Sequence, residues 1–471
     1  MSPESNYDVV VIGGGPAGYG AALYGAAAGL SVAVVERDKV GGTCLHRGCI
    51  PAKHFLETAS VFRTVAGAGE FGVMAIAPEV DFAASQARKG RVVAQLHKGL
   101  IATMAGRGVT TIAGTATLAG PGLVRVQAQG EGDSGAAEAL DLRGRSIILA
   151  TGSTPRAIPG FEIDGRLVLS SDEVLSLDKL PATAAVIGGG AIGCEFASMM
   201  SDLGTKVTLL EVLPRLLPGC DVDVVDVVAK SFRRRGIAVH TGVAVHGHEP
   251  SSESTEVHFG DHESIEVDAV ILAVGRRPLS ATLGLDDGEV DARGFVVVDR
   301  HMRTGVEGVY AVGDLVDTPQ LAHVAFAEAI VAIATILGED PPGVDYANVP
   351  WCIYCHPEVA FCGMSEEAAR KAGHDVMVSK HRYNGGRAMI LNEAQGLVKV
   401  IAERQSNGEA GRILGVHMVG PWVTEQLGEG YLAVNWEATA AEVGHLIHPH
   451  PTLSETFGEA ALALTGRGLH G

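Results

Sequence analysis

Short apolar runs alternate with helix-like stretches along the first part of the chain. Residues 8–12 (DVVVI) form an apolar run that ends in a glycine cluster, an alanine-rich stretch follows as far as Gly29, and residues 31–36 (SVAVVE) form a second run. Runs this short and this continuously apolar are typical of strands buried inside a parallel sheet. Their order predicts a βαβ unit that ends at Glu36.

The same order recurs later in the chain. Residues 184–187 lead into a second glycine cluster, a helix-like stretch continues to Gly204, and residues 206–211 (KVTLLE) form the next apolar run. Each cluster has the spacing GxGxxG, formed by Gly13, Gly15 and Gly18 in the first copy and by Gly188, Gly190 and Gly193 in the second. In both copies the first glycine lies 23 positions before the acidic residue that ends the second run, which is Glu36 or Glu211.

This repeated spacing predicts two dinucleotide-binding units. The glycines let the backbone approach a pyrophosphate at a helix N-terminus, and the acidic residue accepts hydrogen bonds from a ribose. A carboxylate repels a 2′-phosphate, so Glu211 favours NAD over NADP in the second unit. Arg215 lies four residues further on, and nearby arginines are the residues that NADP sites recruit.

Two segments of similar sequence follow the two units. Residues 147–159 (IILATGSTPRAIP) predict a strand followed by a crossover rich in glycine and proline, and residues 270–278 (VILAVGRRP) repeat this pattern. Residues 309–314 (VYAVGD) predict a return to the first unit. Beyond Tyr346, strand-like pieces such as residues 396–401 alternate with helical ones, which indicates an α+β third domain. We expect three domains, covering residues 1–153 together with 276–345, residues 154–275, and residues 346–471.

The composition narrows the functional classes. The chain has 471 residues, of which 46% are hydrophobic, and a formal net charge of −19. This charge disfavours nucleic acid and anionic membranes as partners and is most simply a solvated acidic surface. No basic region of a secretory signal is visible, and no uncharged apolar stretch reaches the roughly 18 residues of a membrane span. Because seven cysteines are few for this length, the sequence predicts a cytoplasmic protein in a reducing compartment.

A cysteine pair follows the first unit directly. Cys44 and Cys49 lie in the segment GGTCLHRGCIPAK, shortly after Glu36. Residues five apart in a regular helix have Cα atoms about 8 Å apart, whereas a disulfide needs roughly 4.4–6.8 Å. The segment is therefore expected to be irregular between the cysteines, with Gly48 supplying the freedom and Pro51 beginning the regular helix.

Three interpretations of this pair are open from the residues alone. A structural disulfide would add only about 2 kcal/mol over so short a loop, and a cytosol would tend to reduce it. Two free core thiols are the second interpretation. The third, which the adjacent glycine fingerprint favours, is a thiol–disulfide couple that exchanges electrons with a bound flavin.

Further candidates for chemistry lie near the C-terminus. The segment HPHPTLSE places His450 five residues before Glu455. Dithiol oxidation needs a base near neutral pH, and a carboxylate on the second ring nitrogen would fix the histidine tautomer. Taken alone, a histidine near a glutamate is more often a surface or turn feature. Cys352, Cys355 and Cys362 lack the second spaced pair of a zinc site, so we interpret them as structural thiols.

Together these motifs resemble the pyridine nucleotide–disulfide oxidoreductase family, and most closely its members that oxidise dihydrolipoamide. The likeness spans essentially the whole chain and rests on both fingerprints and on GGTCLHRGCIPAK, ATGSTPR, VGRRP, YAVGD, QLAHVAFAEA, HPEVAFCG and HPHPTLSE. It implies two Rossmann-like domains, the first for FAD and the second for NAD, and a C-terminal α+β dimerisation domain that forms a homodimer. It also implies that the substrate is the lipoyl domain of a 2-oxo acid dehydrogenase complex or of the glycine cleavage system.

The resemblance also implies roles for individual residues. Cys44 would be the interchange thiol that faces the substrate, and Cys49 the thiol on the flavin side. His450 would be the catalytic base and Glu455 its partner, both supplied by the other subunit. Further matches concern the cofactors: Lys53 with its ion-pair partner Glu195 beside the flavin, Gly114, Asp314 and Ala322 at FAD, and Gly275 and Val243 at NAD.

Some positions depart from the commonest family pattern. His46 and Arg47 stand where Asn and Val are usual, and added positive charge there would lower a thiol pKa. Cys355 and His356 stand where Thr and Asn are common in the lipoamide-oxidising members, and His-Pro at this place is similar to the glutathione reductases. A glutathione or mycothione reductase-like enzyme that uses NADPH is therefore the alternative function. A non-catalytic flavin-binding subunit is a further alternative.

Overall fold

The computed structural model describes residues 5–127 and 139–470, and both predicted βαβ units are present in it. The first unit consists of β1 (Ser5–Ile12), α1 (Pro16–Ala27) and β2 (Val32–Glu36), with the two strands parallel. The second consists of β9 (Thr183–Ile187), α6 (Ala191–Asp202) and β10 (Lys206–Glu211), again with parallel strands. The apolar runs within these strands, such as residues 9–12 and 32–35, are buried, which explains their continuously apolar sequences.

The first unit is the centre of a seven-stranded sheet. Its strand order is β3-β2-β1-β6-β5-β4, and β17 pairs with β6 on a separate path. The added strands are β3 (Thr110–Ala113), β4 (Thr115–Gly120), β5 (Leu123–Gln127), β6 (Leu140–Leu149) and β17 (Val309–Ala311). Because β17 comes from the segment VYAVGD, the chain does return to the first sheet, as the sequence predicts.

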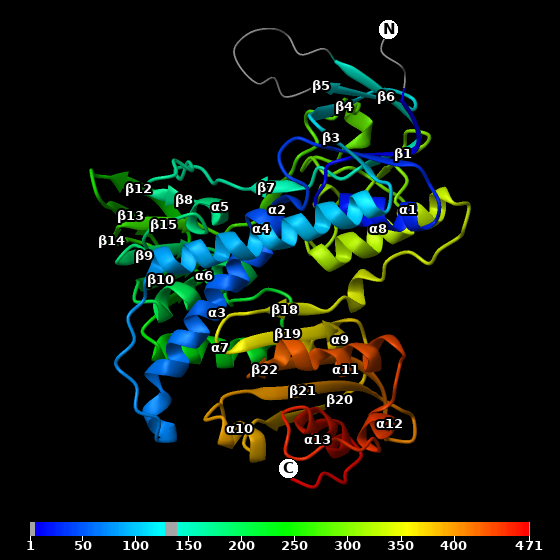
Figure 1. The fold of residues 1–471 in the computed structure, drawn as a ribbon. Helices are drawn as coiled ribbons and strands as arrows, with labels where there is room; N and C mark the ends of the chain where they lie inside the picture. Colours follow the sequence, from blue (N-terminus) through cyan, green and yellow to red (C-terminus); the bar gives the residue numbers. More distant parts are fainter. Residues whose placement is uncertain (1–4, 128–138, 471) are drawn as a thin grey trace.

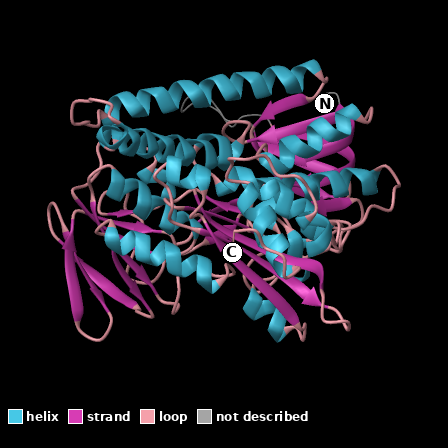
Figure 2. Ribbon diagram, turned by 90° about the horizontal axis from the view of Figure 1, so that it is seen from below, coloured by secondary structure: helices cyan, strands magenta, loops and turns pink. Residues whose placement is uncertain are grey.

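The second unit extends into a five-stranded sheet of order β11-β10-β9-β15-β8, and a separate antiparallel sheet β12-β13-β14 lies beside it. The strands are β8 (Val168–Leu169), β11 (Ala238–Thr241), β12 (Val245–Pro250), β13 (Thr255–Phe259), β14 (Glu263–Val267) and β15 (Ala269–Leu272). The sheet β12-β13-β14 forms one outer edge of the molecule, at the left in both views (Figures 1 and 2).

The two predicted crossovers pair with each other. The segment ATGSTPR contains β7 (Ser153–Pro155), and VGRRP contains β16 (Arg276–Pro278). These short strands form a two-stranded antiparallel sheet. The chain therefore leaves the first sheet and comes back to it at one place, and this pairing fixes where the second unit is attached.

The C-terminal part is an antiparallel sheet covered by helices, which confirms the predicted α+β architecture. Its strand order is β18-β19-β22-β21-β20. The strands are β18 (Trp351–Ile353), β19 (Glu358–Gly363), β20 (Val376–Arg382), β21 (Leu397–Arg404) and β22 (Ala410–Gly420). In Figure 1 this sheet and its helices occupy the lower part of the molecule, below both nucleotide-type units.

Helices connect and cover these sheets. The remaining α-helices are α2 (Gly42–His46), α3 (Cys49–Ala66), α4 (Phe82–Gly106), α5 (Ser171–Val174), α7 (Val222–Arg234), α8 (Ala322–Ile336), α9 (Glu366–Lys371), α10 (Gly386–Ile390), α11 (Val423–Asn435), α12 (Ala440–Gly444) and α13 (Glu455–Leu464). Short 3₁₀ turns span Ala68–Phe71, Asp287–Glu289, Gly313–Leu315 and Tyr346–Asn348. Within the described ranges, no helix has the length and apolar character that crossing a membrane requires.

A buried ion cluster ties the C-terminal sheet to the second unit. Lys399 on β21 is completely buried, and its Nζ lies 2.8 Å from Asp221 Oδ1 and 2.6 Å from Asp223 Oδ2. Glu366 Oε2 is a third neighbour at 2.8 Å. Asp221 also caps the N-terminus of α7. Burial opposes the charged form of Lys399, but the three carboxylates outweigh it and raise the pKa of the ammonium.

Removing the Lys399 charge is expected to destabilise the protein strongly. The change Lys399→Met leaves Asp221 buried without its cation, which costs about 3–5 kcal/mol in comparable cases. Lys380→Met is the matched control, because the half-exposed Lys380 also contacts Asp223, at 2.7 Å, and such a pair contributes about 1 kcal/mol or less. Thermal unfolding should show a clear drop for the first variant only. Equal melting temperatures would contradict the bridging role of Lys399.

Candidate redox and nucleotide site

Two glycines in each fingerprint are required by close backbone packing. Gly13 has φ +103°, and a Cβ built on it would lie 2.3 Å from Ala150 O. A Cβ on Gly18 would lie 1.8 Å from Gly13 O. The second loop repeats both distances. A Cβ built on Gly188 would lie 2.3 Å from a carbonyl oxygen that follows β15, and one built on Gly193 would lie 1.8 Å from Gly188 O. No other residue type fits these four positions, so the two loops have one shape.

The middle glycine of each loop leaves a helix N-terminus open. Gly15 precedes α1 and Gly190 precedes α6, and neither helix has a side-chain cap or an acidic residue in its first turn. No described atom lies within 4 Å of a Cβ built on either glycine. The free N–H groups and the helix dipole therefore face open space, which is the environment that a pyrophosphate needs. Both loops thus fit a dinucleotide.

The acidic residues at the strand ends hold the loops in place. Glu36 Oε2 accepts a hydrogen bond from Gly14 N at 2.6 Å, and its Oε1 accepts one from Asp38 N at 2.8 Å. Glu211 accepts from Gly189 N and, at 2.7 Å, from Leu213 N. An ionised carboxylate has about four acceptor positions, so each glutamate keeps acceptor capacity for a ribose.

Three predicted FAD contacts lie around the first loop. Gly114 N donates to Glu36 O at 2.9 Å, which places Gly114 beside the ribose-binding candidate. Asp314 Oδ2 accepts a hydrogen bond of 2.5 Å from Ser153 Oγ. Ala322 is the first residue of α8, whose N-terminus has no side-chain cap. Two residues before Ala322, Gln320 Nε2 is buried without a hydrogen-bond partner among the described residues. A buried amide without an acceptor fits a site that a polar cofactor completes.

The predicted NAD contacts surround the second loop. Val243 N donates to Glu211 O at 3.0 Å, and Gly275, directly before β16, has φ +103°. Arg215 Nη1 lies 3.2 Å from Glu367 Oε2, which belongs to α9 in the C-terminal part. Both side chains of this pair are largely exposed, so it contributes about 1 kcal/mol or less.

The cysteine segment is attached to the first glycine loop. Gly41 N donates to Gly14 O at 2.7 Å, and Gly42 lies so close to Gly15 that a Cβ would be 2.7 Å from its Cα. The chain is irregular at residues 47–48, between α2 and α3, as the sequence predicts. The predicted helix start at Pro51 is wrong, because α3 begins at Cys49. Proline is tolerated throughout a first turn, where N–H groups have no partner within the helix, so it does not mark the first residue.

The two thiols are unequal. The Cys44 and Cys49 side chains hydrogen-bond to each other, and this bond lowers the pKa of Cys49 and raises that of Cys44. Burial raises both pKa values and the ammonium of Lys53 lowers both, while the Glu195 carboxylate raises the pKa of Cys49. Cys49 is also the first residue of an 18-residue helix, whose dipole favours a thiolate. In the dithiol state, these surroundings favour a thiolate at Cys49 over one at Cys44.

The expected ion pair between Lys53 and Glu195 is present. Lys53 Nζ donates to both Glu195 carboxylate oxygens at 2.9 Å, and Tyr354 N donates to Glu195 Oε1 at 3.0 Å. The ammonium also lies 4.8 Å from the centre of the Tyr354 ring. Burial opposes the charge on Lys53, but Glu195 outweighs it, so the pKa of Lys53 is raised. A permanent positive charge is thereby held beside Cys49.

Four contacts in and around the cysteine segment were not predicted. His46 Nε2 and His97 Nδ1 both contact Val40 O, at 2.9 and 3.0 Å, and so hold the backbone that leads into the segment. Arg47 lies 3.2 Å from Asp38 and 3.7 Å from Asp172 on α5, a helix of the second unit. His46 and Arg47 are visible in the sequence as departures from the family pattern. The position of His97 on α4 gives no such signal.

The candidate base lies far from the cysteines in one chain. His450 Nδ1 lies 2.7 Å from Glu455 Oε2, as expected, and the His450 side chain is 72% exposed. His448 instead contacts Glu429 at 2.8 Å and is 13% exposed. Figure 1 shows α13, which begins at Glu455, at the lower end of the molecule and α2 in its upper half. A single chain therefore does not bring His450 to Cys44.

The other cysteines identified as structural thiols contact backbone carbonyl groups. Cys355 Sγ lies 3.2 Å from Pro357 O, Cys362 Sγ 3.1 Å from Asn348 O, and Cys352 Sγ 3.7 Å from Thr424 O. Burial raises the pKa of all three thiols. Within the described ranges, none of them belongs to a group of three metal-ligating side chains.

Comparison with known proteins covers the whole chain. Residues 7–329 match the sequence model of the pyridine nucleotide-disulphide oxidoreductases, and residues 349–461 match that of their dimerisation domain. A dihydrolipoyl dehydrogenase of Bacillus subtilis is 38% identical over 480 residues, covering 99% of each chain. One of Thermus scotoductus is 39% identical over 473 residues, covering 98% of each.

Solved structures show the same full-length likeness. The crystal structure of LpdA from Mycobacterium tuberculosis has a TM-score of 0.88 at 25% identity and covers 98% of this chain and 99% of that one. The HOCl-induced flavoprotein disulfide reductase RclA from Escherichia coli has a TM-score of 0.84 at 28% identity, with coverage of 97% and 99%.

Replacing Lys53 is expected to raise the pKa of Cys49. The change Lys53→Met removes the attracting ammonium and leaves the Glu195 carboxylate, which opposes the thiolate. The midpoint of thiolate formation should therefore move upward by about one pH unit or more, equivalent to about 1.4 kcal/mol per unit. The measurement is the rate of Cys49 alkylation by iodoacetamide against pH in the reduced protein. Lys89→Met, whose ammonium contacts Leu175 O at 2.9 Å, is the control. Equal midpoints in all three proteins would refute the role of Lys53.

Proposed function

The chain belongs to the pyridine nucleotide-disulphide oxidoreductase family, and from this premise we propose that it oxidises protein-bound dihydrolipoamide and reduces NAD⁺ to NADH. The family match, the fold and the full-length likeness to dihydrolipoyl dehydrogenases confirm an oxidoreductase that acts on a sulfur group with FAD and NAD. The observation that carries the proposal is the Cys44–Cys49 pair, held on the first glycine loop and beside Lys53.

The two thiols divide the reaction between them. In the oxidised protein, His450 takes a proton from one substrate thiol, and the resulting thiolate attacks Cys44 Sγ. Cys49 leaves as a thiolate, which Lys53 and the N-terminus of α3 stabilise. The second substrate thiol then displaces Cys44 from the mixed disulfide, so lipoamide leaves and Cys44 becomes a thiol. When bound, FAD supplies a two-electron carrier and NAD⁺ the final hydride acceptor.

The base is assigned to the second subunit of a homodimer. His450 is exposed and remote from Cys44 within one chain, while Glu455 orients its ring from the first turn of α13. Glu455 accepts at Nδ1, which leaves Nε2 as the base. The dimerisation-domain match over residues 349–461 supports contribution of this segment to a partner's site.

Several finer assignments complete the proposal. The Glu211 carboxylate at the end of β10 supports NAD rather than NADP. As predicted, we assign the glycines and the glutamate of the first loop to FAD and those of the second loop to NAD. We place the limits of the second domain in the crossovers that contain β7 and β16. The substrate is the lipoyl domain of a 2-oxo acid dehydrogenase complex or of the glycine cleavage system. The cytoplasm is the proposed location.

A direct assay tests the substrate and the nucleotide. The purified yellow protein should form NADH from NAD⁺ and dihydrolipoamide, because the thiol pair and Glu211 fit these reactants. Cys44→Ser should abolish turnover while the flavin stays bound, since the interchange sulfur is lost. Cys362→Ser, at a thiol remote from the pair, should retain turnover. The proposal fails if dihydrolipoamide is inert while NADPH reduces glutathione or mycothiol disulfide.

Mixing two inactive variants tests the shared site. Cys44→Ser and His450→Gln should each be inactive as homodimers. A heterodimer combines the intact Cys44 of one chain with the intact His450 of the other, so a random mixture should regain about a quarter of wild-type activity. The heterodimer isolated after co-expression with two different tags should have about half of wild-type activity, because one of its two sites is intact. Activity that stays absent in an isolated, flavin-loaded heterodimer would place both residues in sites of the same chain.

A further inference from the structure

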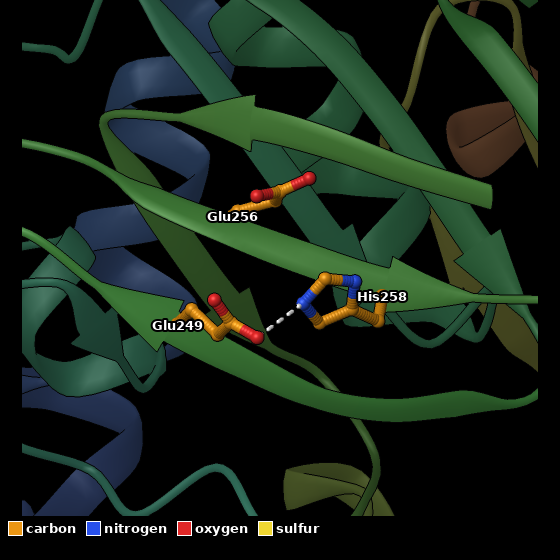
Figure 3. A group of neighbouring side chains, drawn as sticks. All are labelled: Glu249, Glu256 and His258. Carbon is orange, nitrogen blue, oxygen red and sulfur yellow. Dashed lines mark ion pairs between the residues drawn. The ribbon is translucent and has the colours of Figure 1, made fainter. Parts of the chain in front are cut away.

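Three side chains gather on the outer face of the sheet β12-β13-β14, far from the cysteine pair. Glu249 lies on β12, and Glu256 and His258 lie two residues apart on β13. One ligand atom from each of the three lies within 4.8 Å of the other two. Figure 3 shows the three side chains together, with Glu249 directed at the His258 ring.

The strand pattern places these three residues on the same outer face of the sheet. Along β13, Val257 and Phe259 point into the core, while Glu256 and His258 alternate with them and lie outside. Glu249 is the direct cross-strand partner of Glu256. Directly paired residues share a face of an antiparallel sheet, so the three side chains are held by backbone pairing rather than by a flexible loop.

The charges of this face are unfavourable without a cation. Glu256 is directly opposite Glu249 on one side and opposite Glu266 on the other, which makes a row of three carboxylates across three strands. Like charges in directly opposite positions destabilise a sheet. Ser264 Oγ donates to Glu256 Oε1 at 2.6 Å and fixes that carboxylate, which leaves Oε2 available.

The histidine supplies a second, independent observation. His258 Nε2 is shielded from solvent and has no hydrogen-bond partner among the described residues. It lies 3.4 Å from Glu249 Oε1, close enough for an ion pair but without hydrogen-bond geometry. The His258 side chain as a whole is 37% exposed, so an ion can reach this nitrogen, and an imidazole nitrogen without a hydrogen bond can act as a metal ligand.

We propose that Glu249, Glu256 and His258 bind one divalent transition-metal ion of the zinc class. One imidazole nitrogen and two carboxylate oxygens are a usual zinc ligand set, and a water molecule would complete four-coordination. Imidazole selects against the calcium and magnesium ions that all-oxygen sites prefer. The ion would neutralise the carboxylate row and cross-link β12 to β13, so it would stabilise the second unit without touching the redox site.

Zinc titration of the tag-free flavoprotein tests this site. The protein is kept oxidised, so that Cys44 and Cys49 cannot ligate the ion, and is first treated with a chelator. Calorimetry should give one Zn²⁺ per chain, and zinc should raise the melting temperature. Glu256→Gln and His258→Gln should each weaken binding at least about tenfold and remove the thermal response.

Matched controls separate this site from general surface binding. Glu263→Gln makes the same charge change on β14, and His246→Gln removes another exposed histidine on β12, so both should bind zinc as the wild type does. Without metal, Glu256→Gln should melt at or above the wild-type temperature, because the carboxylate row is broken. The proposal is refuted if Glu256→Gln and His258→Gln bind zinc as tightly as the two control variants. It is also refuted if all four variants show only weak, nonstoichiometric zinc binding.

Discussion

The ion pair between Lys53 and Glu195 is the contact on which the arrangement of the redox site depends. Glu195 is buried, and a buried carboxylate needs partners for its charge. It receives them from α3, through Lys53, and from the C-terminal part, through Tyr354 N. Lys53 lies one helical turn beyond Cys49, so the charge that stabilises the thiolate is anchored by the second unit. Three parts of the chain thus meet at one carboxylate beside the reactive sulfur.

The two βαβ units share one loop structure but are followed by different segments of the chain. Their glycine loops agree in backbone conformation, in close approaches and in the glutamate that holds each loop. The difference arises after the second strand. In both units the chain returns to its own loop, through Gly41 N to Gly14 O at 2.7 Å and Leu217 N to Gly189 O at 2.8 Å. The first unit then presents Cys44, whereas the second continues to α7 and the buried cluster around Lys399. The redox function therefore depends on the segment that follows a shared scaffold.

The local sequence pattern was sufficient to predict elements whose structure depends on residue spacing and backbone geometry. Both βαβ units, the irregular step near Gly48 and the return of residues 309–314 to the first sheet were predictable for this reason. The helix start at Pro51 was not, since proline is compatible with any first-turn position. His97 and Tyr354 act on the site from distant segments, and neither position carries a periodic or motif signal.

The sequence by itself determined the two glycine loops, the acidic strand ends, the cysteine pair and the class of chemistry, because each depends on residues close together in the chain. Only the tertiary structure shows what favours a thiolate at Cys49, since this depends on a helix N-terminus and on a lysine held by a glutamate 142 positions away. It also decided that His450 is exposed and remote from Cys44, and that Glu249 and His258 converge across two strands. Electrostatic interactions act through space, so their outcome becomes visible only when the chain has folded.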